Sequence, residues 1–417
     1  MTEISETTRS RFADFGIDIE SAMMRAAVVP ISMPCWQFDD VSGLENVGAT
    51  LRGGGIAATG TYPGKPRTGE ELRQDIELAL CLCPGITRLN LHACYAERAD
   101  SSVDRDAYTV ADFSRWMEWA AELNTGLDFN PSFFSHPNAD KGFTLSSPDE
   151  KTRQFWVNHG KACRKIAEAI GEQQGNRCTV NVWIPDGYKD LPADRLGPRQ
   201  RLTASLDDIF SVAVNENAIE DAVESKLFGI GSEAYVVGSF EFYYGYAQKN
   251  QKLLCLDAGH FHPTETITDK ISSVLMYLPN LLLHLTRGMR WDSDHVVILD
   301  DLTKEIIDEV VRGNYLDRVR IGLDYFDASI NRIAAATLGV RSTRKALLMS
   351  MLQPHAKLKE LEAAGDFTAR LCLLEEIKTL PFGEIWEAFC IQHDCPGESE
   401  WLKEIQDYEE SEFPQRA

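Results

Sequence analysis

Residues 253–294 read LLCLDAGHFHPTETITDKISSVLMYLPNLLLHLTRGMRWDSD, and this stretch decides the predicted fold. Two short apolar runs, 253–256 and 281–285, are typical of buried strands, and a helical pattern at 267–277 separates them. A strand, a helix and a second strand in this order predict a βαβ unit, in which the two strands run parallel.

Oxygen and nitrogen donors stand at the ends of both predicted strands. Asp257 and His260 follow the first strand, His284 lies within the second, and Asp292 and Asp294 follow it. Carboxylates and imidazoles are the ligands that Mn²⁺, Mg²⁺ and Co²⁺ take in proteins. Because a buried acid is costly unless it is paired or bound to a metal, these residues together predict a divalent-cation site.

The rest of the chain repeats the same unit. Strand patterns lie at 27–32, 86–92, 126–130, 178–184, 219–224, 253–257, 281–285 and 319–324. Helices are predicted before and between them, at 4–24, 70–82, 107–123, 147–173, 198–215, 267–277 and 303–312. Eight alternating strands and helices predict a (β/α)8 TIM barrel. An open doubly wound sheet is the alternative, but no glycine-rich fingerprint follows the first strand.

Two parts of the chain depart from this repeat. We expect residues 1–340 to form the barrel with the metal site, and residues 341–417 to form a helical C-terminal extension. Helices are predicted at 329–338, 344–352, 354–364, 369–380, 382–393 and 401–410. The extension is expected to make oligomer contacts, or else only to cap the barrel. Residues 43–66, rich in glycine, threonine and proline, predict a long loop that either binds a ligand or is a plain surface loop.

The overall composition excludes some classes of function. The net charge of −22 disfavours a nucleic-acid partner, since phosphate binding needs clustered lysine and arginine. The ten cysteines include no C-x-x-C pair, and free thiols in a large chain favour the cytoplasm. The polar start MTEISETTRSRF shows no signal peptide, and the apolar run near 274–285 is too interrupted to span a membrane.

In a barrel, the C-terminal strand ends face the active site. The titratable residues expected there are His92, Glu224, Lys226, Asp257, His260, His284, Asp292, Asp294 and Asp324. Five carboxylates in one cavity cannot all stay ionised without cations, and two divalent cations bridged by Asp257 would compensate them. Taken singly, His284 is more typical of a core histidine, Glu224 of a partner for Lys226, and Asp324 of a salt-bridged strand end. Their joint position favours the metal site.

Aromatic residues gather at the same strand ends. They are Trp36, Phe129, Phe133, Phe134, Trp183 and Trp291. Aromatic walls beside metal ions suit a sugar, whose C–H faces pack on rings, although each residue alone is equally typical of a core.

Long motifs in the chain resemble one known family. The runs are SMPCWQFDDVSG, ATGTYPGK, RLNLHACY, GLDFNPSFFSHP, NVWIPDG, AVESKLFGIG, CLDAGHFHPTE, RWDSDHVVILDD and GLDYFDASINRIAA. In this order and spacing, over about residues 11–405, they resemble bacterial L-rhamnose isomerase. The resemblance implies a TIM-barrel aldose–ketose isomerase that interconverts L-rhamnose and L-rhamnulose, uses Mn²⁺ or related ions, and forms a cytoplasmic homotetramer.

The resemblance also implies roles for single residues. One ion would be held by Glu224, Asp257, His284 and Asp324, and a second by His260, Asp292 and Asp294, with Asp257 bridging. Lys226 would lie near the reacting end of the sugar, and Trp36, His92, Phe129 and Trp183 would line the sugar pocket.

The implied chemistry is a 1,2-hydride shift, in which Lys226 stabilises charge on O1 and Asp324 is a candidate proton carrier. Co²⁺ or Mg²⁺ would be able to replace Mn²⁺. The alternatives are an isomerase of another aldose on the same site, a TIM-barrel metallohydrolase, and a barrel without activity whose acids only pair with lysine and arginine.

Overall fold

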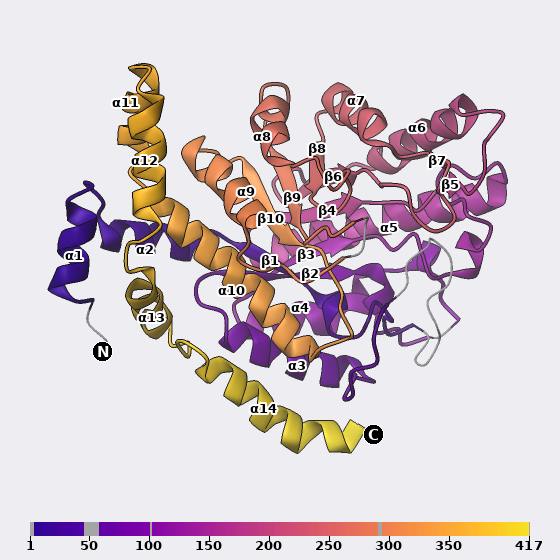
Figure 1. The fold of residues 1–417 in the computed structure, drawn as a ribbon. Helices are drawn as coiled ribbons and strands as arrows, with labels where there is room; N and C mark the ends of the chain where they lie inside the picture. Colours follow the sequence, from indigo (N-terminus) through magenta and orange to yellow (C-terminus); the bar gives the residue numbers. More distant parts are fainter. Residues whose placement is uncertain (1–3, 46–57, 101, 291–293, 417) are drawn as a thin grey trace.

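Eight parallel strands form the centre of the molecule. The computed structural model describes residues 4–45, 58–100, 102–290 and 294–416. The strands are β1 (Ile31–Pro34), β2 (Thr87–His92), β3 (Gly126–Asn130), β4 (Cys178–Val182), β6 (Ile219–Glu224), β8 (Leu253–Asp257), β9 (Leu281–Leu285) and β10 (Val319–Leu323). They follow the order β3-β2-β1-β10-β9-β8-β6-β4 and curl into a nearly closed barrel with helices around it (Figure 1), which confirms the predicted TIM barrel.

The two strands of the opening stretch show why the sequence folds in this way. Every residue of β8 and of β9 is buried, as expected for strands covered on both faces. Side chains bridge the one seam of the barrel, between β3 and β4. The backbone N–H of Thr179 donates to Asp128 Oδ1 at 3.0 Å, and that of Asn181 donates to Asn130 Oδ1 at 3.2 Å.

Helices cover the outside of the barrel. Those around it are α2 (Ile19–Val28), α3 (Gly69–Cys81), α4 (Ser114–Glu122), α5 (Glu150–Gln174), α6 (Leu196–Phe210), α7 (Phe240–Asn250), α8 (Thr268–Leu275) and α9 (Asp301–Arg312). The first helix, α1 (Glu6–Ala13), is set off from the barrel (Figure 1). The helix α7 was not predicted, nor was the short antiparallel pair β5 (Gly187–Tyr188) and β7 (Tyr235–Val236).

The N-terminal prediction was wrong in two details. The single helix expected at 4–24 is two helices, because Gly16 has a left-handed φ of +73° and Asp18 then caps α2 by accepting from Ser21 N at 3.0 Å. The strand expected at 27–32 begins only at Ile31, since α2 continues to Val28. Pro30 then holds Val29 in an extended conformation (ψ 116°) and ends the helix.

The C-terminal helices are α10 (Arg332–Met351), α11 (His355–Ala363), α12 (Phe367–Ile377), α13 (Phe382–Gln392) and α14 (Glu400–Glu412). The two helices predicted at 329–338 and 344–352 are in fact the single helix α10, which runs through residue 340. The predicted boundary between the barrel and the C-terminal extension, at residue 340, falls inside this helix and stays a prediction. In Figure 1, α11 and α12 project from the body of the molecule, whereas α14 lies along its lower edge. Tyr408 Oη donates to Asp75 Oδ1 at 2.8 Å and ties α14 to α3.

The predicted long loop is described only in part, since residues 46–57 lie outside the described residues. Its end is attached to the C-terminal region: Arg332 Nη1 donates to the carbonyl oxygen of Tyr62 at 2.7 Å, and the Tyr62 hydroxyl donates to Glu409 at 3.0 Å. Whether the loop contributes to ligand binding stays a prediction.

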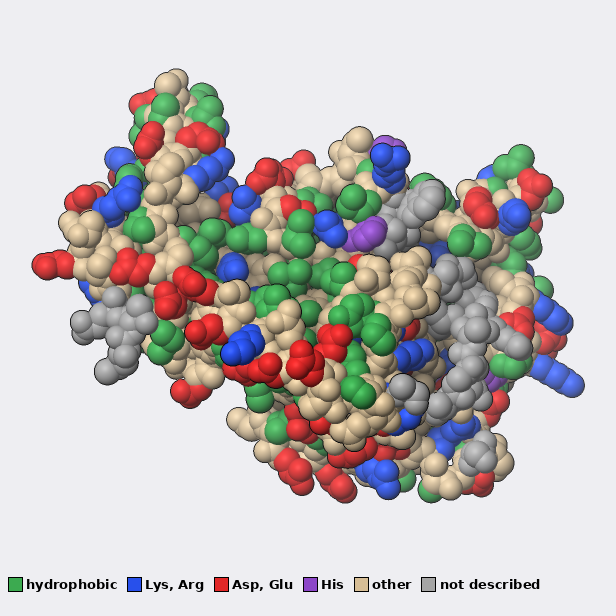
Figure 2. Space-filling view, turned by 60° about the horizontal axis from the view of Figure 1, so that its bottom comes forward, with side chains coloured by type: hydrophobic (Ala, Val, Ile, Leu, Met, Phe, Trp, Pro, Cys, Tyr) green, Lys and Arg blue, Asp and Glu red, His purple; other side chains and the backbone are tan. Residues whose placement is uncertain are grey.

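The surface and the thiols agree with the sequence. The described side chains on the face in Figure 2 form no continuous basic patch, and acidic groups are spread across it. All ten cysteines are free thiols. Among the described residues, no helix has the length and apolar character needed to cross a membrane.

Candidate metal centre

Four of the predicted residues meet at one end of the barrel. Glu224 ends β6, Asp257 ends β8, His284 lies in β9, and Asp324 directly follows β10. Asp257 is paired with His284 in the ladder between β8 and β9, so the two side chains stand at the same level. Each of the four residues offers a ligand atom, and these atoms all lie within 4.8 Å of one another.

Three of the side chains, all carboxylates, surround one ring nitrogen of the fourth, His284. His284 Nδ1 lies 3.2 Å from Glu224 Oε2, 3.2 Å from Asp324 Oδ2 and 3.7 Å from Asp257 Oδ2. One N–H group can donate a good hydrogen bond to only one of three oxygens. Among the described residues, Asp257 Oδ2 and both nitrogens of His284 are buried without a hydrogen bond of acceptable geometry. Such buried polar atoms are rare, and a bound ion is a usual explanation.

These spacings fit a divalent cation. Around an octahedral ion with ligand bonds near 2.1 Å, neighbouring ligand atoms lie about 3.0 Å apart. The two 3.2 Å contacts of His284 Nδ1 are close to that value. The donor set of three carboxylates and one imidazole is the one that Mn²⁺ and Mg²⁺ accept, and a bound ion would satisfy Asp257 Oδ2 and His284 Nδ1 at once.

The electrostatics of the cluster point to a missing positive charge. Burial raises the pKa of the Asp257 carboxyl well above its usual range, and the nearby Glu224 and Asp324 raise it further. Burial opposes the charged imidazolium of His284, yet Cys255 and Glu224 beside it raise its pKa well above the usual value. Protons on Asp257 and His284 therefore supply the positive charge that a cation would otherwise bring.

The second predicted group of ligands is described in part. His260 is buried, and its Nδ1 lies 3.1 Å from Glu224 Oε1, which joins it to the first cluster. The backbone carbonyl of Asp294 accepts from Phe326 N at 3.3 Å, so Asp294 lies beside the segment that follows Asp324. Asp292, like Trp291, lies outside the described residues.

An aromatic wall leads away from the cluster. Trp36 Nε1 donates a 3.0 Å hydrogen bond to Asp324 Oδ1. The ring of Trp36 meets His92 edge to face at 4.8 Å between centroids, and His92 meets Phe134 in the same way at 5.3 Å. The structure thus places Trp36 directly beside a predicted metal ligand, and His92 next to Trp36.

The wall continues to the predicted lysine. Phe134 meets the ring of Trp183 at 6.1 Å, and Lys226 Nζ lies 5.1 Å from the centre of that ring. Trp183 Nε1 is a buried donor without a hydrogen-bond partner among the described residues. One cation and one N–H donor therefore stand on an apolar surface, as a sugar pocket requires.

Phe129 does not belong to this wall, contrary to the prediction. Its ring is fully buried and packs on Phe113 at 4.8 Å, in the layer between the barrel and its outer helices. Asp128 and Asn130, on either side of it in β3, line a cavity inside the barrel. Because neighbouring strand residues point to opposite faces, Phe129 faces outward.

His92 stays neutral at its place in the wall. Burial, with Arg105 and His284 nearby, lowers its pKa to about 3. Its Nδ1 lies 3.1 Å from Ser132 Oγ, which fixes the orientation of the ring. A neutral imidazole can face a sugar without adding a positive charge that would repel a nearby cation.

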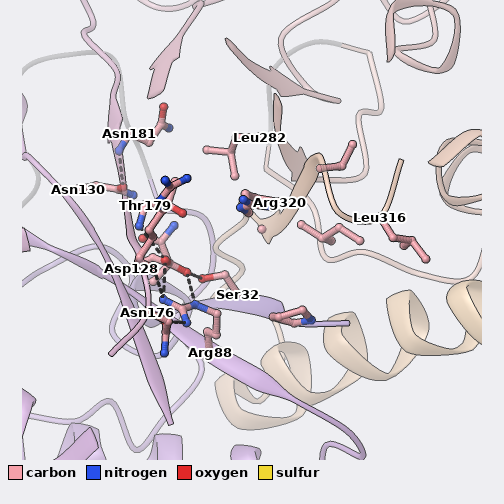
Figure 3. Close-up of a pocket in the computed structure, with 16 residues that line it drawn as sticks. Ser32, Arg88, Asp128, Asn130, Asn176, Thr179, Asn181, Leu282, Leu316 and Arg320 are labelled. Atoms are coloured by element: carbon pink, nitrogen blue, oxygen red, sulfur yellow. Dashed lines mark hydrogen bonds and ion pairs between the residues drawn. The ribbon is translucent and has the colours of Figure 1, made fainter. Parts of the chain in front are cut away.

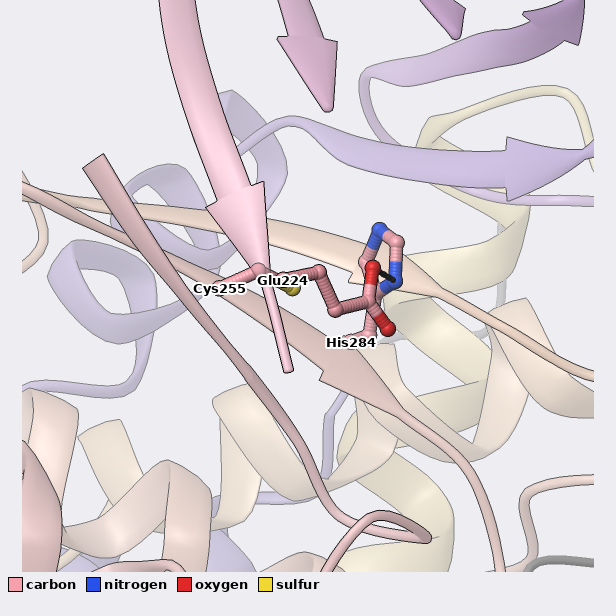
Figure 4. A group of neighbouring side chains, drawn as sticks. All are labelled: Glu224, Cys255 and His284. Carbon is pink, nitrogen blue, oxygen red and sulfur yellow. Dashed lines mark ion pairs between the residues drawn. The ribbon is translucent and has the colours of Figure 1, made fainter. Parts of the chain in front are cut away.

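Two residues at the site were not assigned to it from the sequence. Asn181 in β4 donates from Nδ2 to Glu224 Oε2, and Cys255 lies in β8 beside Glu224 and His284 (Figure 4). The signal was available in both cases. Asn181 stands two residues before Trp183, and Cys255 two residues before Asp257, so each shares a strand face with a predicted site residue.

A polar cavity of about 290 Å³ also lies inside the barrel (Figure 3). None of the four ligands lines it, although Asn181 in its wall donates to Glu224. Its charged groups are paired with each other or with near neighbours. Arg88 binds Asp128 at 3.0 Å, and Arg320 binds Glu220 at 2.7 Å. The unpaired buried donors of the metal cluster are therefore the stronger candidate for chemistry.

The chain is similar to several known proteins. A family model described as L-rhamnose isomerase matches residues 1–416. L-rhamnose isomerases of Shigella flexneri serotype 5b and Escherichia coli O127:H6 are each 56% identical over 411 residues, which cover 99% of this chain and 98% of the relative. Among solved structures, an L-ribulose 3-epimerase aligns over 79% of this chain and 97% of its own, with 13% identity and a TM-score of 0.48.

Proposed function

The chain belongs to the L-rhamnose isomerase family, and on this premise we propose that it interconverts L-rhamnose and L-rhamnulose as a metal-dependent aldose–ketose isomerase. One observation carries the proposal: the four converging ligands are joined to an aromatic wall by the hydrogen bond from Trp36 to Asp324. A cation site and a sugar-binding surface thus share one residue.

We propose that two divalent cations bind per subunit, as Mn²⁺ with Co²⁺ or Mg²⁺ able to replace it. Glu224, Asp257, His284 and Asp324 would hold one ion. His260, Asp292 and Asp294 would hold the other, with Asp257 shared. When bound, the ions would act as Lewis acids on the oxygens of the sugar and orient it.

The chain itself would position the sugar and move its protons. Asp324 is the most open of the four ligands, with 23% of its side chain exposed, so it can face both ion and substrate. Trp36 holds one oxygen of Asp324, and the carboxylate is then placed to carry a proton between O2 and O1. Lys226, held over Trp183, would donate to O1 as negative charge develops there. The buried Trp183 N–H would bind a sugar hydroxyl.

The proposed reaction is a 1,2-hydride shift in the open-chain sugar. The hydrogen on C2 moves to C1 with its bonding electrons, while the proton of the O2 hydroxyl is transferred to O1. The aldehyde becomes an alcohol and C2 becomes the ketone, so no oxidant is needed. In this mechanism the migrating hydrogen never exchanges with solvent.

Turnover of L-rhamnose in D₂O tests both the activity and the route. We expect L-rhamnulose whose mass shows no carbon-bound deuterium. Deuterium at C1 would refute the hydride shift and indicate an enediol with a side-chain base. If the protein forms no ketose from L-rhamnose but forms one from another aldose, the proposed substrate is wrong and the proposed reaction stands. Activity only on phosphate esters would favour a metallohydrolase, which the net charge of −22 disfavours.

We also propose a cytoplasmic homotetramer whose C-terminal extension contributes to subunit contacts. The ten free thiols support a reducing compartment. No residue of α12 is buried, and Phe367 and Leu371 on it are 58% and 59% exposed, which supports a contact role. Light scattering of the intact protein tests the assembly. A fourfold subunit mass is expected, and a monomer would refute it.

A further inference from the structure

A second group of possible ligands shares Glu224 and His284 with the four residues described above, and adds Cys255 deeper in the barrel. Cys255 is the ladder partner of Glu224 between β6 and β8, and it precedes Asp257 by two residues on the same face of β8. One ligand atom each from Glu224, Cys255 and His284 lies within 4.8 Å of the others, and all three residues are buried (Figure 4).

The donors of this group differ in kind from those of the upper cluster. A cysteine sulfur, a carboxylate and an imidazole form a set that Zn²⁺ and Cd²⁺ prefer, whereas Mn²⁺ and Mg²⁺ prefer oxygen. Neither nitrogen of His284 has a hydrogen bond of acceptable geometry among the described residues. At least one buried imidazole nitrogen is therefore available to a second ion position.

The position of Cys255 separates it from the other core thiols of the described residues. It packs with Ala222, Leu253 and Leu282 in a small apolar cluster, yet it lies beside the ligand atoms of Glu224 and His284. A bound cation would displace the thiol proton and leave a neutralised thiolate in this apolar setting. The apolar neighbours offer no competing polar partner to a thiophilic ion.

We propose that Cys255, with Glu224 and His284, forms a second cation site for a thiophilic divalent ion such as Zn²⁺ or Cd²⁺. The site shares a carboxylate and an imidazole with the upper cluster, so the two ions compete. Binding of the softer ion draws Glu224 and His284 toward the sulfur and releases the hard ion. The sulfur of Cys255 thereby sets the selectivity of the barrel among divalent cations. The competition rests on the hard-cation site of the proposed function, whereas the thiophilic site itself does not.

Titration of the metal-stripped, full-length protein with Cd²⁺ tests the site directly. A thiolate bound to cadmium gives a charge-transfer band in the ultraviolet. We expect one equivalent of this band to be lost in Cys255→Ser, relative to the unaltered protein. Cys178→Ser is the matched control, because Cys178 is also fully buried in a barrel strand but belongs to neither ligand group. An unchanged band in Cys255→Ser would overturn the proposal.

Displacement of Mn²⁺ tests the competition. The protein is loaded with Mn²⁺, and the six-line electron paramagnetic resonance signal of free Mn²⁺ is followed as Cd²⁺ is added. Half-release is expected to need at least tenfold more Cd²⁺ in Cys255→Ser than in Cys178→Ser. Equal Mn²⁺-release curves for the two variants, or no release in either, would refute the proposed competition. Retained Mn²⁺ binding by Cys255→Ser shows that the variant is folded. No readout involves sugar turnover, so a failure here leaves the isomerase proposal unaffected.

Discussion

Replacing Trp36 with phenylalanine isolates the link between the metal cluster and the aromatic wall. The substitution keeps a ring against His92 but removes the 3.0 Å hydrogen bond from Nε1 to Asp324 Oδ1. A hydrogen bond to a charged group contributes about 1.5–3 kcal/mol. Because water reaches the 23% exposed Asp324, the lower figure applies. A loss of about 1.5 kcal/mol corresponds to a Kd for Mn²⁺ that is roughly tenfold higher.

The assay is Mn²⁺ binding to the metal-stripped protein, measured from free Mn²⁺ by paramagnetic resonance. Trp119→Phe is the matched control, since Trp119 Nε1 also donates to a carboxylate, Glu77 Oε1, at 2.6 Å but on the outer helix α4. We expect Trp119→Phe to bind Mn²⁺ as the unaltered protein does. Equal Kd values for the two variants would refute the reasoning that Trp36 positions a metal ligand.

Three further substitutions test the packing of the site and of the fold. Gly322→Ala places a Cβ 3.1 Å from His284 Cδ2 and should weaken Mn²⁺ binding several-fold in a titration, whereas Gly245→Ala enters open space and should not. Arg105→Met removes the ion pair of the buried Glu45 and one donor from each of three backbone carbonyls, so chemical denaturation should show a loss of about 3–5 kcal/mol. Burial and Arg105 lower the pKa of His159 to about 3, below its unfolded value of about 6.5. The unfolding free energy should therefore fall as the pH drops from 6.5 toward 3, and His159→Gln should flatten this slope by about 1.4 kcal/mol per pH unit; equal slopes would contradict a buried neutral imidazole.

The strands β8 and β9 could be predicted from the sequence because they are buried on both faces and carry nearly continuous apolar runs. The helix boundaries were harder to predict. The prediction left a gap at residues 339–343, which include Gly339, where the structure has the continuous helix α10. The structure instead uses Gly339 for packing, since a Cβ there would overlap the hydroxyl of Tyr325. A glycine required by a distant contact looks the same in sequence as one that ends a helix.

The candidate site, too, could be predicted from the sequence only in part. Positions at strand ends were enough to place Glu224, Asp257, His284 and Asp324 together, because a barrel brings all such ends to one face. Phe129 was misplaced because the alternation of faces along β3 was not applied to it. Asn181 was missed because the site was sought among titratable residues at strand ends, whereas this uncharged side chain reaches Glu224 from within β4.

The most direct test of the central claim is L-rhamnulose formation by the metal-stripped protein as Mn²⁺ is added back. We expect no turnover without metal, and activity that rises with occupancy of the site and is lost in Asp257→Asn. Asp257 is chosen because both proposed ions use it. Full turnover of L-rhamnose by metal-free protein, or by Asp257→Asn, would contradict a catalytic role for this cluster.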